Sequence, residues 1–219
     1  MTKIALAAPR LRAATLTPQR LDDIELEAEI DLRGLQLGGL ARGEARNGRF
    51  SGLIFESARL GAVSWRRAHF EDVVWRQCDL AGLDGREIFA SRIEMEGCRA
   101  TGLVAPESNW RDAVFRDTKI SLSQFRFAKF ERVLFQNCDL READFQNADL
   151  RGAQFRDCDL RGAQFSFALL SGADFRTCQT ENVTIEAQAL RGLIVSPLQA
   201  AQFAAILGLQ VRWNDSDEV

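Results

Sequence analysis

The side chains of this 219-residue chain that are best suited to chemistry are five cysteines, one histidine and a series of aspartates. The cysteines stand at regular intervals, at Cys78, Cys98, Cys138, Cys158 and Cys178. Thiolates can bind metals, exchange disulfides or act as nucleophiles. However, the spacing matches no Cys/His metal motif, and nothing pairs a cysteine or serine with His69. We interpret His69 as a surface residue and the cysteines as reduced core thiols, with a redox or metal role as the alternative.

The aspartates could be taken for the paired carboxylates of acid–base catalysis. They recur in steps of five or ten, at Asp139, Asp144, Asp149 and Asp159. Such regular spacing is typical of a structural repeat, and no Gly-rich phosphate loop accompanies it. We therefore predict a binding protein rather than an enzyme, with no catalytic residue, no metal site and no cofactor.

A repeat with a period of five dominates the sequence. From Trp110 to Phe175, every position that is a multiple of five holds a large apolar residue, and the residue two before it is small or β-branched. A period of five fits neither an amphipathic helix nor a half-buried strand. Two inward residues in every five, on a chain that turns every five, describe one side of a square coil. The pattern predicts a solenoid.

The unit is clearest between Cys138 and Asp157, which read CDLRE, ADFQN, ADLRG and AQFRD. A small residue, then Asp or Asn, then Leu or Phe, then two variable positions resembles the motif of the pentapeptide-repeat family. The resemblance covers about residues 30–195, because looser matches from Phe50 to Leu80 and at Ile185 and Leu190 keep the same frame. It implies an all-β fold, a right-handed quadrilateral parallel β-helix of about eight coils.

Four sides of five predict that positions twenty apart stack directly. The five cysteines then share one column, with Thr118 in the gap. Between residues 83 and 105 the large position shrinks, as at Gly85 and Ala90, while the other inward position grows, as at Leu83 and Ile88. A close-packed interior needs such an exchange of volume. Corners are expected two residues after each large position, where Gly, Asn and Asp are frequent and accept a positive φ.

Charge and hydropathy exclude several classes of function. The formal net charge of −3 and a pI near 5.4 argue against direct binding of nucleic acid. No segment has the uncharged apolar length of a membrane span, and residues 1–8 are too short an apolar stretch for a signal peptide. We expect one cytoplasmic domain. On its surface, Arg111, Glu131 and Arg151 are expected to form a ladder of alternating charge.

Both ends of a β-helix must be closed, because an open coil exposes its core and an unpaired edge. Residues 1–29 are expected to form an arm and a capping strand, since Ile24 to Leu32 alternates strictly. Residues 196–213 should form a buried helix from Ser196 to Gly208 and a short strand, and residues 214–219 a flexible tail. The helix caps the last coil or joins two subunits, and its candidate residues are Leu198, Phe203, Ile206, Leu207 and Trp213.

Two groups of outward apolar residues are candidate partner-binding surfaces. The first is a column on one flat side, interrupted by Glu94: Ile54, Val74, Val114 and Leu134. The alternative is that β-branched residues simply suit a strand. The second group holds aromatic rings, the usual anchors of protein interfaces, and comprises Phe127, Phe167, Leu169 and Phe89. Its alternative is packing at a corner beneath a terminal segment.

The family resemblance also implies a partner. Its best-understood members, the Qnr-type and mycobacterial fluoroquinolone-resistance proteins, are dimeric rods joined through C-terminal helices that engage DNA gyrase, in part by resembling duplex DNA. A homodimer that binds DNA gyrase or another type II topoisomerase and protects it from inhibitors is therefore implied. The chain departs from the Qnr type in lacking projecting loops and in carrying Arg116, Arg156 and Arg176 among its acids. The alternative is an interaction scaffold for another cytosolic protein.

Overall fold

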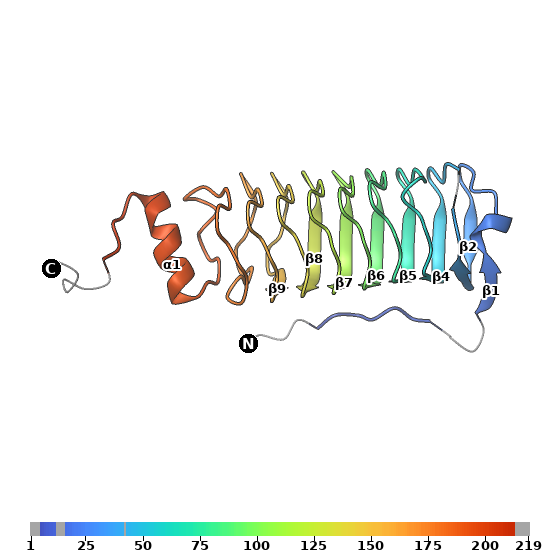
Figure 1. Cartoon of the computed structure of the whole chain (residues 1–219), viewed down its shortest axis with the longest axis horizontal. Helices are drawn as coiled ribbons and strands as arrows, with labels where there is room; N and C mark the ends of the chain where they lie inside the picture. Colours follow the sequence, from blue (N-terminus) through green and yellow to red (C-terminus); the bar gives the residue numbers. More distant parts are fainter. Residues whose placement is uncertain (1–4, 12–15, 42, 213–219) are drawn as a thin grey trace.

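The computed structural model describes residues 5–11, 16–41 and 43–212, with only the backbone of Asp23. They form a straight rod of parallel coils that ends in a short helix (Figure 1). Its elements are β1 (Thr17–Arg20), a 3-10 helix (Leu21–Asp23), β2 (Asp31–Arg33), β3 (Leu35–Gly38), β4 (Arg49–Glu56), β5 (His69–Arg76), β6 (Phe89–Glu96), β7 (Asn109–Arg116), β8 (Lys129–Gln136), β9 (Gln154–Arg156), α1 (Pro197–Ala204) and a 3-10 turn (Ala205–Leu207). Neither α1 nor any other helix in these ranges has the length and hydropathy to cross a bilayer.

Successive coils pair in parallel with a constant step. Arg49 of β4, His69 of β5 and Phe89 of β6 lie side by side, and the same step continues through β7 and β8. Isolated bridges carry it from Glu44 as far as Ile194. The predicted stacking of positions twenty apart is confirmed.

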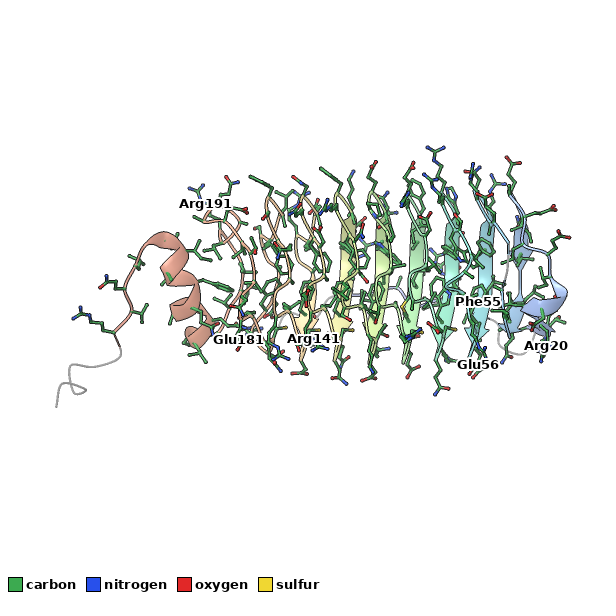
Figure 2. All side chains as sticks on the ribbon, turned by 45° about the horizontal axis from the view of Figure 1, so that its top comes forward. Arg20, Phe55, Glu56, Arg141, Glu181 and Arg191 are labelled. Atoms are coloured by element: carbon green, nitrogen blue, oxygen red, sulfur yellow. The ribbon has the colours of Figure 1, made fainter. Side chains whose placement is uncertain are left out.

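The bore of the rod is filled by the two inward positions of each repeat. From Leu53 to Thr180, every residue at a multiple of five and every residue two before it is buried. Phe55 lies within the rod while its neighbour Glu56 points away from it (Figure 2). Burial of this apolar column in every coil is the main force that holds the rod together.

The corners lie where the sequence places them. All of the predicted Gly, Asn and Asp positions have a positive φ: Gly52, Gly82, Gly102, Asp112, Asn137, Asn147, Gly152, Asp157, Gly162, Gly172, Asn182 and Gly192. Bulkier side chains occupy the same conformation at other corners, among them Leu122, Phe127 and Phe167. The tight turn that closes each unit of five is therefore a property of the backbone that the repeat imposes.

The N-terminal end differs from the prediction. Residues 24–32 are not one strand, because Leu26 bridges to Gly43, Glu29 turns with a φ of 65°, and β2 begins only at Asp31. The alternation is present, but it belongs to two sides of a coil. The step between coils is also shorter here by two positions, as between Gln36 and Ile54. The regular register therefore spans about seven turns rather than eight.

The helix α1 lies against the last coil (Figure 1). Ser196 caps it as predicted, since its hydroxyl accepts from the Gln199 amide, and Gly208 ends the following turn with a φ of 74°. The Gln199 side chain donates to the carbonyls of Phe175 and Cys178, at 2.7 and 2.8 Å. Residues 209–212 form no strand.

Candidate protein-binding surfaces

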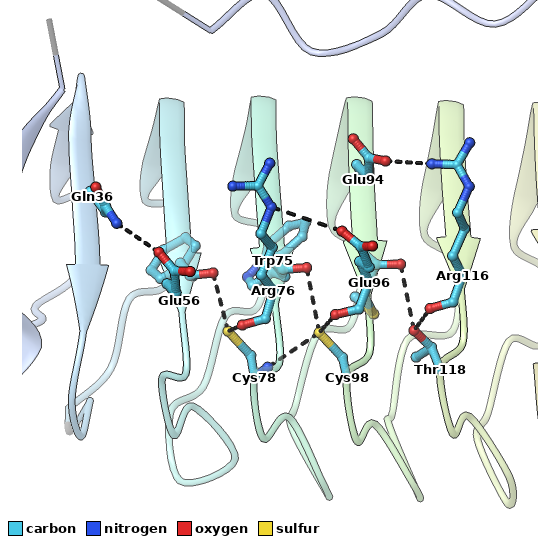
Figure 3. A network of polar contacts seen from close by, with 12 residues as sticks. Gln36, Glu56, Trp75, Arg76, Cys78, Glu94, Glu96, Cys98, Arg116 and Thr118 are labelled. Carbon is cyan, nitrogen blue, oxygen red and sulfur yellow. Dashed lines mark hydrogen bonds and ion pairs between the residues drawn. The ribbon is translucent and has the colours of Figure 1, made fainter. Parts of the chain in front are cut away.

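The cysteine column has a structural role, because its thiols bind backbone carbonyls of the coils. All five thiols are free and buried in one line, as predicted. The thiols of Cys78 and Cys98 donate to the backbone carbonyl two residues earlier, and the hydroxyl of Thr118 does the same in the gap (Figure 3). The thiols of Cys138 and Cys158 make the same bond in later coils. The neighbouring Cys158 thiol and burial raise the pKa of the Cys138 and Cys178 thiols, which disfavours the thiolate at these two positions, whereas their hydrogen bonds lower the pKa of Cys158.

The repeated aspartates are neutralised locally. Four of them pair with the arginine two residues later, at 2.6–2.8 Å: Asp139 with Arg141, Asp149 with Arg151, Asp159 with Arg161 and Asp174 with Arg176. The arginine hydrogen bonds lower the pKa of each carboxyl below its usual 3.8. These acids therefore stay ionised and cannot donate a proton near neutral pH. Among the described residues, no group of His, Cys, Asp and Glu could hold a metal ion.

The predicted charge ladder forms only in part. Arg111 pairs with Glu131 of the next coil at 2.9 Å, whereas Arg151 pairs with Asp149 of its own coil. A second ladder, in the column that starts at Gly52, was not predicted: Arg92 binds Asp72 and Arg132 binds Asp112, each through two nitrogens. The alternation of Asp and Arg at positions twenty apart was the signal that could have revealed it.

The second predicted surface is exposed. Phe89, Phe127, Phe167 and Leu169, which we call the corner row, are 47%, 57%, 61% and 51% exposed. They belong to two adjoining columns at one corner, so successive aromatic members lie two coils, or about 10 Å, apart along the rod. His69 is exposed too, and its ring stacks on Phe89 with centroids 5.0 Å apart.

Two members of the corner row share the backbone conformation of the corners. Phe127 and Phe167 both have a φ of 59°, which is uncommon for a bulky residue and is usually taken by glycine or asparagine. The intervening position of the same column is Asn147, with a φ of 58°. Leu122 and several charged residues hold the same conformation at other corners, so it belongs to the coil and does not mark these two rings as a binding site.

The first predicted surface is not free. Ile54, Val74 and Leu134 are only 7%, 2% and 6% exposed, and Val114 is half-buried, although all four point away from the bore. Residues 5–11, which we call the arm, run back along the rod beside β8 to β4 (Figure 1). The arm amides of Ala7 and Arg10 donate to the carboxylates of Asp112 and Asp72.

The outer face of α1, together with the 3-10 turn that follows it, is a third apolar surface. Phe203 and Gln199 are buried against the last coil, but Leu198, Ile206 and Leu207 are 62%, 39% and 55% exposed. Within one chain the last coil covers only one face of this helix, so burial of the other face against a second subunit stays a prediction. Trp213 lies outside the described residues.

Two family models match the chain. Residues 68–145 match the model described as Pentapeptide repeat region, and residues 138–176 match Pentapeptide repeats (8 copies). Pentapeptide repeat protein QnrB4 of Escherichia coli is 30% identical over 89 residues, and Quinolone resistance pentapeptide repeat protein QnrB96 of Scandinavium goeteborgense is 27% identical over 84 residues. Each match covers 36% of this chain and only 39% of the relative's length.

Solved structures with the same kind of repeat are also similar. Full-length QnrB1, a plasmid-mediated fluoroquinolone resistance protein, has a TM-score of 0.42 at 21% identity, with 88% of this chain and 100% of that chain covered. HetL of the cyanobacterium Nostoc, a pentapeptide repeat protein involved in heterocyst differentiation regulation, has a TM-score of 0.43 at 17% identity, with 81% and 94% covered.

Proposed function

This chain belongs to the pentapeptide-repeat family, whose members are generally non-catalytic binding proteins, and we propose that it binds a type II topoisomerase and protects it from inhibitors. The observation that carries the proposal is the similarity to two Qnr proteins, one of them 30% identical over 89 residues. The Qnr-type resemblance names DNA gyrase as the partner and fluoroquinolones as the inhibitors. Direct contact with nucleic acid is not part of the proposal, because the net charge is −3.

The corner row supplies the anchors of this interface. Exposed aromatic side chains usually carry most of the binding free energy of a protein interface. Phe127 and Phe167 are the most exposed of the row. Spaced about 10 Å apart along a straight edge, they suit a long groove in a partner better than a compact patch.

The active form is a homodimer joined through α1. The exposed Leu198, Ile206 and Leu207 form an apolar face at the end of the rod, and burial between two copies would remove it from water. Ile206→Asp with Leu207→Asp should convert a dimer into a monomer in sedimentation or light-scattering measurements. Phe203 and the coil beneath it are untouched, so the circular dichroism spectrum should stay the same.

A supercoiling assay tests the partner. Purified DNA gyrase is inhibited with a fluoroquinolone, and the chain is added in increasing amounts. The proposal expects recovery of supercoiling or, at high concentration, inhibition of the enzyme, together with co-purification of chain and gyrase. A chain that neither rescues, inhibits nor co-purifies contradicts the proposal.

A second candidate is an interaction scaffold for another cytosolic protein, and the neutralised acids favour it. A mimic of duplex DNA needs unpaired negative charge along its surface, whereas Asp139, Asp149, Asp159 and Asp174 are each paired with arginine. Here Phe127→Asp with Phe167→Asp should abolish capture of the partner from a lysate of the native host.

The matched control adds the same charge at corners without removing a ring. Gln77→Asp with Asn182→Asp occupies two exposed corner positions outside the column of Phe127 and Phe167, with a φ of 51° and 58°. It should leave capture unchanged, and both variants should keep the circular dichroism spectrum. Unaffected capture by the phenylalanine variant would exclude the corner row as the interface for either partner.

A further inference from the structure

The arm is bound by a repeating feature of the corner that borders the flat side. Its backbone amides at Ala7 and Arg10 donate to the carboxylates of Asp112 and Asp72, at 3.3 and 2.7 Å. Both carboxylates are already held in place by arginines of the next coil, Arg132 and Arg92. The acceptors are thus fixed before the arm arrives, which lowers the cost of binding an extended chain.

The spacing of these acceptors matches the repeat of an extended polypeptide. Asp72 and Asp112 are two coils apart, which corresponds to about 10 Å along the rod. The two amides that they bind are three residues apart, which also corresponds to about 10 Å in an extended chain. The site therefore selects an extended segment that runs from the C-terminal coils toward the N-terminal coils and presents two amides three residues apart.

The apolar column completes the site. The hydrogen-bond register places Leu6 over the coils of Val114 and Leu134, and Leu11 over those of Ile54 and Val74. Leu6, Pro9 and Leu11 are the half-buried residues of the arm, while its other residues are exposed. Apolar side chains at these places are the second requirement that the site sets.

The arm makes few interactions with the rod for a segment of its length. It joins no strand ladder, and within residues 5–11 the hydrogen bonds to the rod are those of Ala7 and Arg10. Two hydrogen bonds, the attraction between the charges of Arg10 and Asp72, and partial burial of three side chains must compensate for ordering residues 5–11. Docked and released arms are therefore close in free energy, and a competing segment can replace the arm.

We propose that the flat side of β4 to β8 is a binding site for an extended, leucine-containing segment of a partner protein, which the arm occupies until the partner displaces it. The site is a different face from the corner row, so it does not depend on which protein the corner row binds. Recognition combines amide donors three residues apart with apolar side chains that lie over the column of Ile54, Val74, Val114 and Leu134.

A peptide titration of the full chain tests the site. The probe is the synthetic heptapeptide ALAAPRL, which has the sequence of residues 5–11. In the variant Leu6→Asp with Leu11→Asp, the new carboxylates lie near Asp112 and Asp72, so the arm should leave. The peptide should bind this variant at submillimolar to millimolar concentration and about two- to tenfold more tightly than the unsubstituted chain, whose tethered arm competes. Amide shifts of Val74 and Val114 in NMR spectra report the binding.

We call the variant Leu6→Asp with Leu11→Asp the released variant. Two further substitutions, each added to it, locate the peptide-binding site. Val114→Asp should remove it, whereas Leu169→Asp, which changes an exposed residue of the corner row, should not. In the unsubstituted chain, the Ala7 and Arg10 amides should exchange with solvent more slowly than in the released variant. Equal affinity of the peptide for both chains, shifts confined to other residues, or equal amide exchange would overturn the proposal.

Discussion

The bore is packed in two different ways along the rod. In the C-terminal half, rings stack nearly parallel at centroid distances of 4.7–5.3 Å in two columns, Phe115–Phe135–Phe155 and Phe125–Phe145–Phe165. In the N-terminal half, tryptophans alternate with residues as small as Gly85 and Ala90. An apolar cavity of about 20 Å³ remains there, lined by Trp65, Phe70, Trp75, Leu80, Leu83, Ile88, Met95, Leu103 and Trp110. The exchange of volume predicted from the sequence is therefore incomplete.

The same contrast extends to polar atoms. The indole of Trp110 donates to the Ser108 hydroxyl at 2.8 Å, and that hydroxyl donates to the Ala105 carbonyl at 2.6 Å. Among the described residues, the Trp65 indole nitrogen is buried without a hydrogen-bond partner. Identical units pack by repetition, whereas each departure from the repeat needs its own compensating neighbour. Trp110 has one in Ser108, and Trp65 does not.

The largest expected effect is in the regular half. Phe145→Ala removes a ring stacked between Phe125 and Phe165, and should lower the free energy of unfolding by about 3 to 5 kcal/mol. The adjacent Gln146 side chain points outward, so Gln146→Ala should change the free energy of unfolding by less than about 0.5 kcal/mol. Denaturant melts of the two variants measure the difference, and equal midpoints would contradict the assigned inward frame.

A smaller effect distinguishes the two tryptophans. Trp110→Phe loses a hydrogen bond and leaves Ser108 without it, whereas Trp65→Phe removes an unpaired donor. Both lose similar volume, so Trp110→Phe should be the more destabilising by about 1 kcal/mol. Thermal unfolding of both purified variants gives the comparison. If Trp65→Phe proved the more destabilising variant, the Trp65 indole would have a hydrogen-bond partner in solution, which would contradict this difference between the two tryptophans.

Filling the cavity in the N-terminal half should stabilise the protein slightly. A Cβ at Gly85 would lie 3.2 Å from Leu83, which borders the cavity and can move into it, and Gly85 has no positive φ. Gly85→Ala should therefore raise the free energy of unfolding by about 0.5 kcal/mol. The control Gly152→Ala meets no atom within 4 Å but has a φ of 72°, so it should destabilise. Loss of stability in both variants would show that the side chains around this cavity cannot rearrange.

The smallest expected effect is on stability at low pH, and it concerns ion pairs of the C-terminal half. The arginine hydrogen bonds hold the folded-state pKa of Asp139, Asp149, Asp159 and Asp174 below 3.8. A lowered folded pKa means that their contribution is complete above the unfolded value and is lost as pH falls through the folded one. The melting temperature should drop less below about pH 4 when all four are changed to Asn. An identical decline in both proteins would show that these exposed pairs contribute nothing.

The repeat made most of the fold predictable. The stacked columns, the cysteine line and the positive-φ corners all follow from the spacing of five, because the same backbone geometry recurs in each coil. The first coil did not follow. Ile24 to Leu32 alternates as a single strand would, and only the turn at Glu29 divides it, at a residue type that does not announce a positive φ.

The candidate surfaces were predictable to a lesser degree. Outward direction could be assigned for Phe127 and for Val114 alike, since both depend on the repeat. Whether such a residue is free depends on segments outside the repeat. The arm reaches Asp112 across 105 residues of sequence, and its leucines and proline carry no periodic signal. Exposure of α1 likewise depends on the width of the coil beneath it.

The constant step from coil to coil makes the rod a ruler with fixed graduations. Each coil adds about 4.8 Å, so a duplicated coil would lengthen the molecule by one graduation and leave every face in line. An insertion whose length is not a whole number of coils would rotate all later graduations away from the earlier ones. The shortened steps, from Thr17 to Leu35 and from Gln36 to Ile54, are found at the N-terminal end, where almost no graduations precede them and the misalignment has little to disturb.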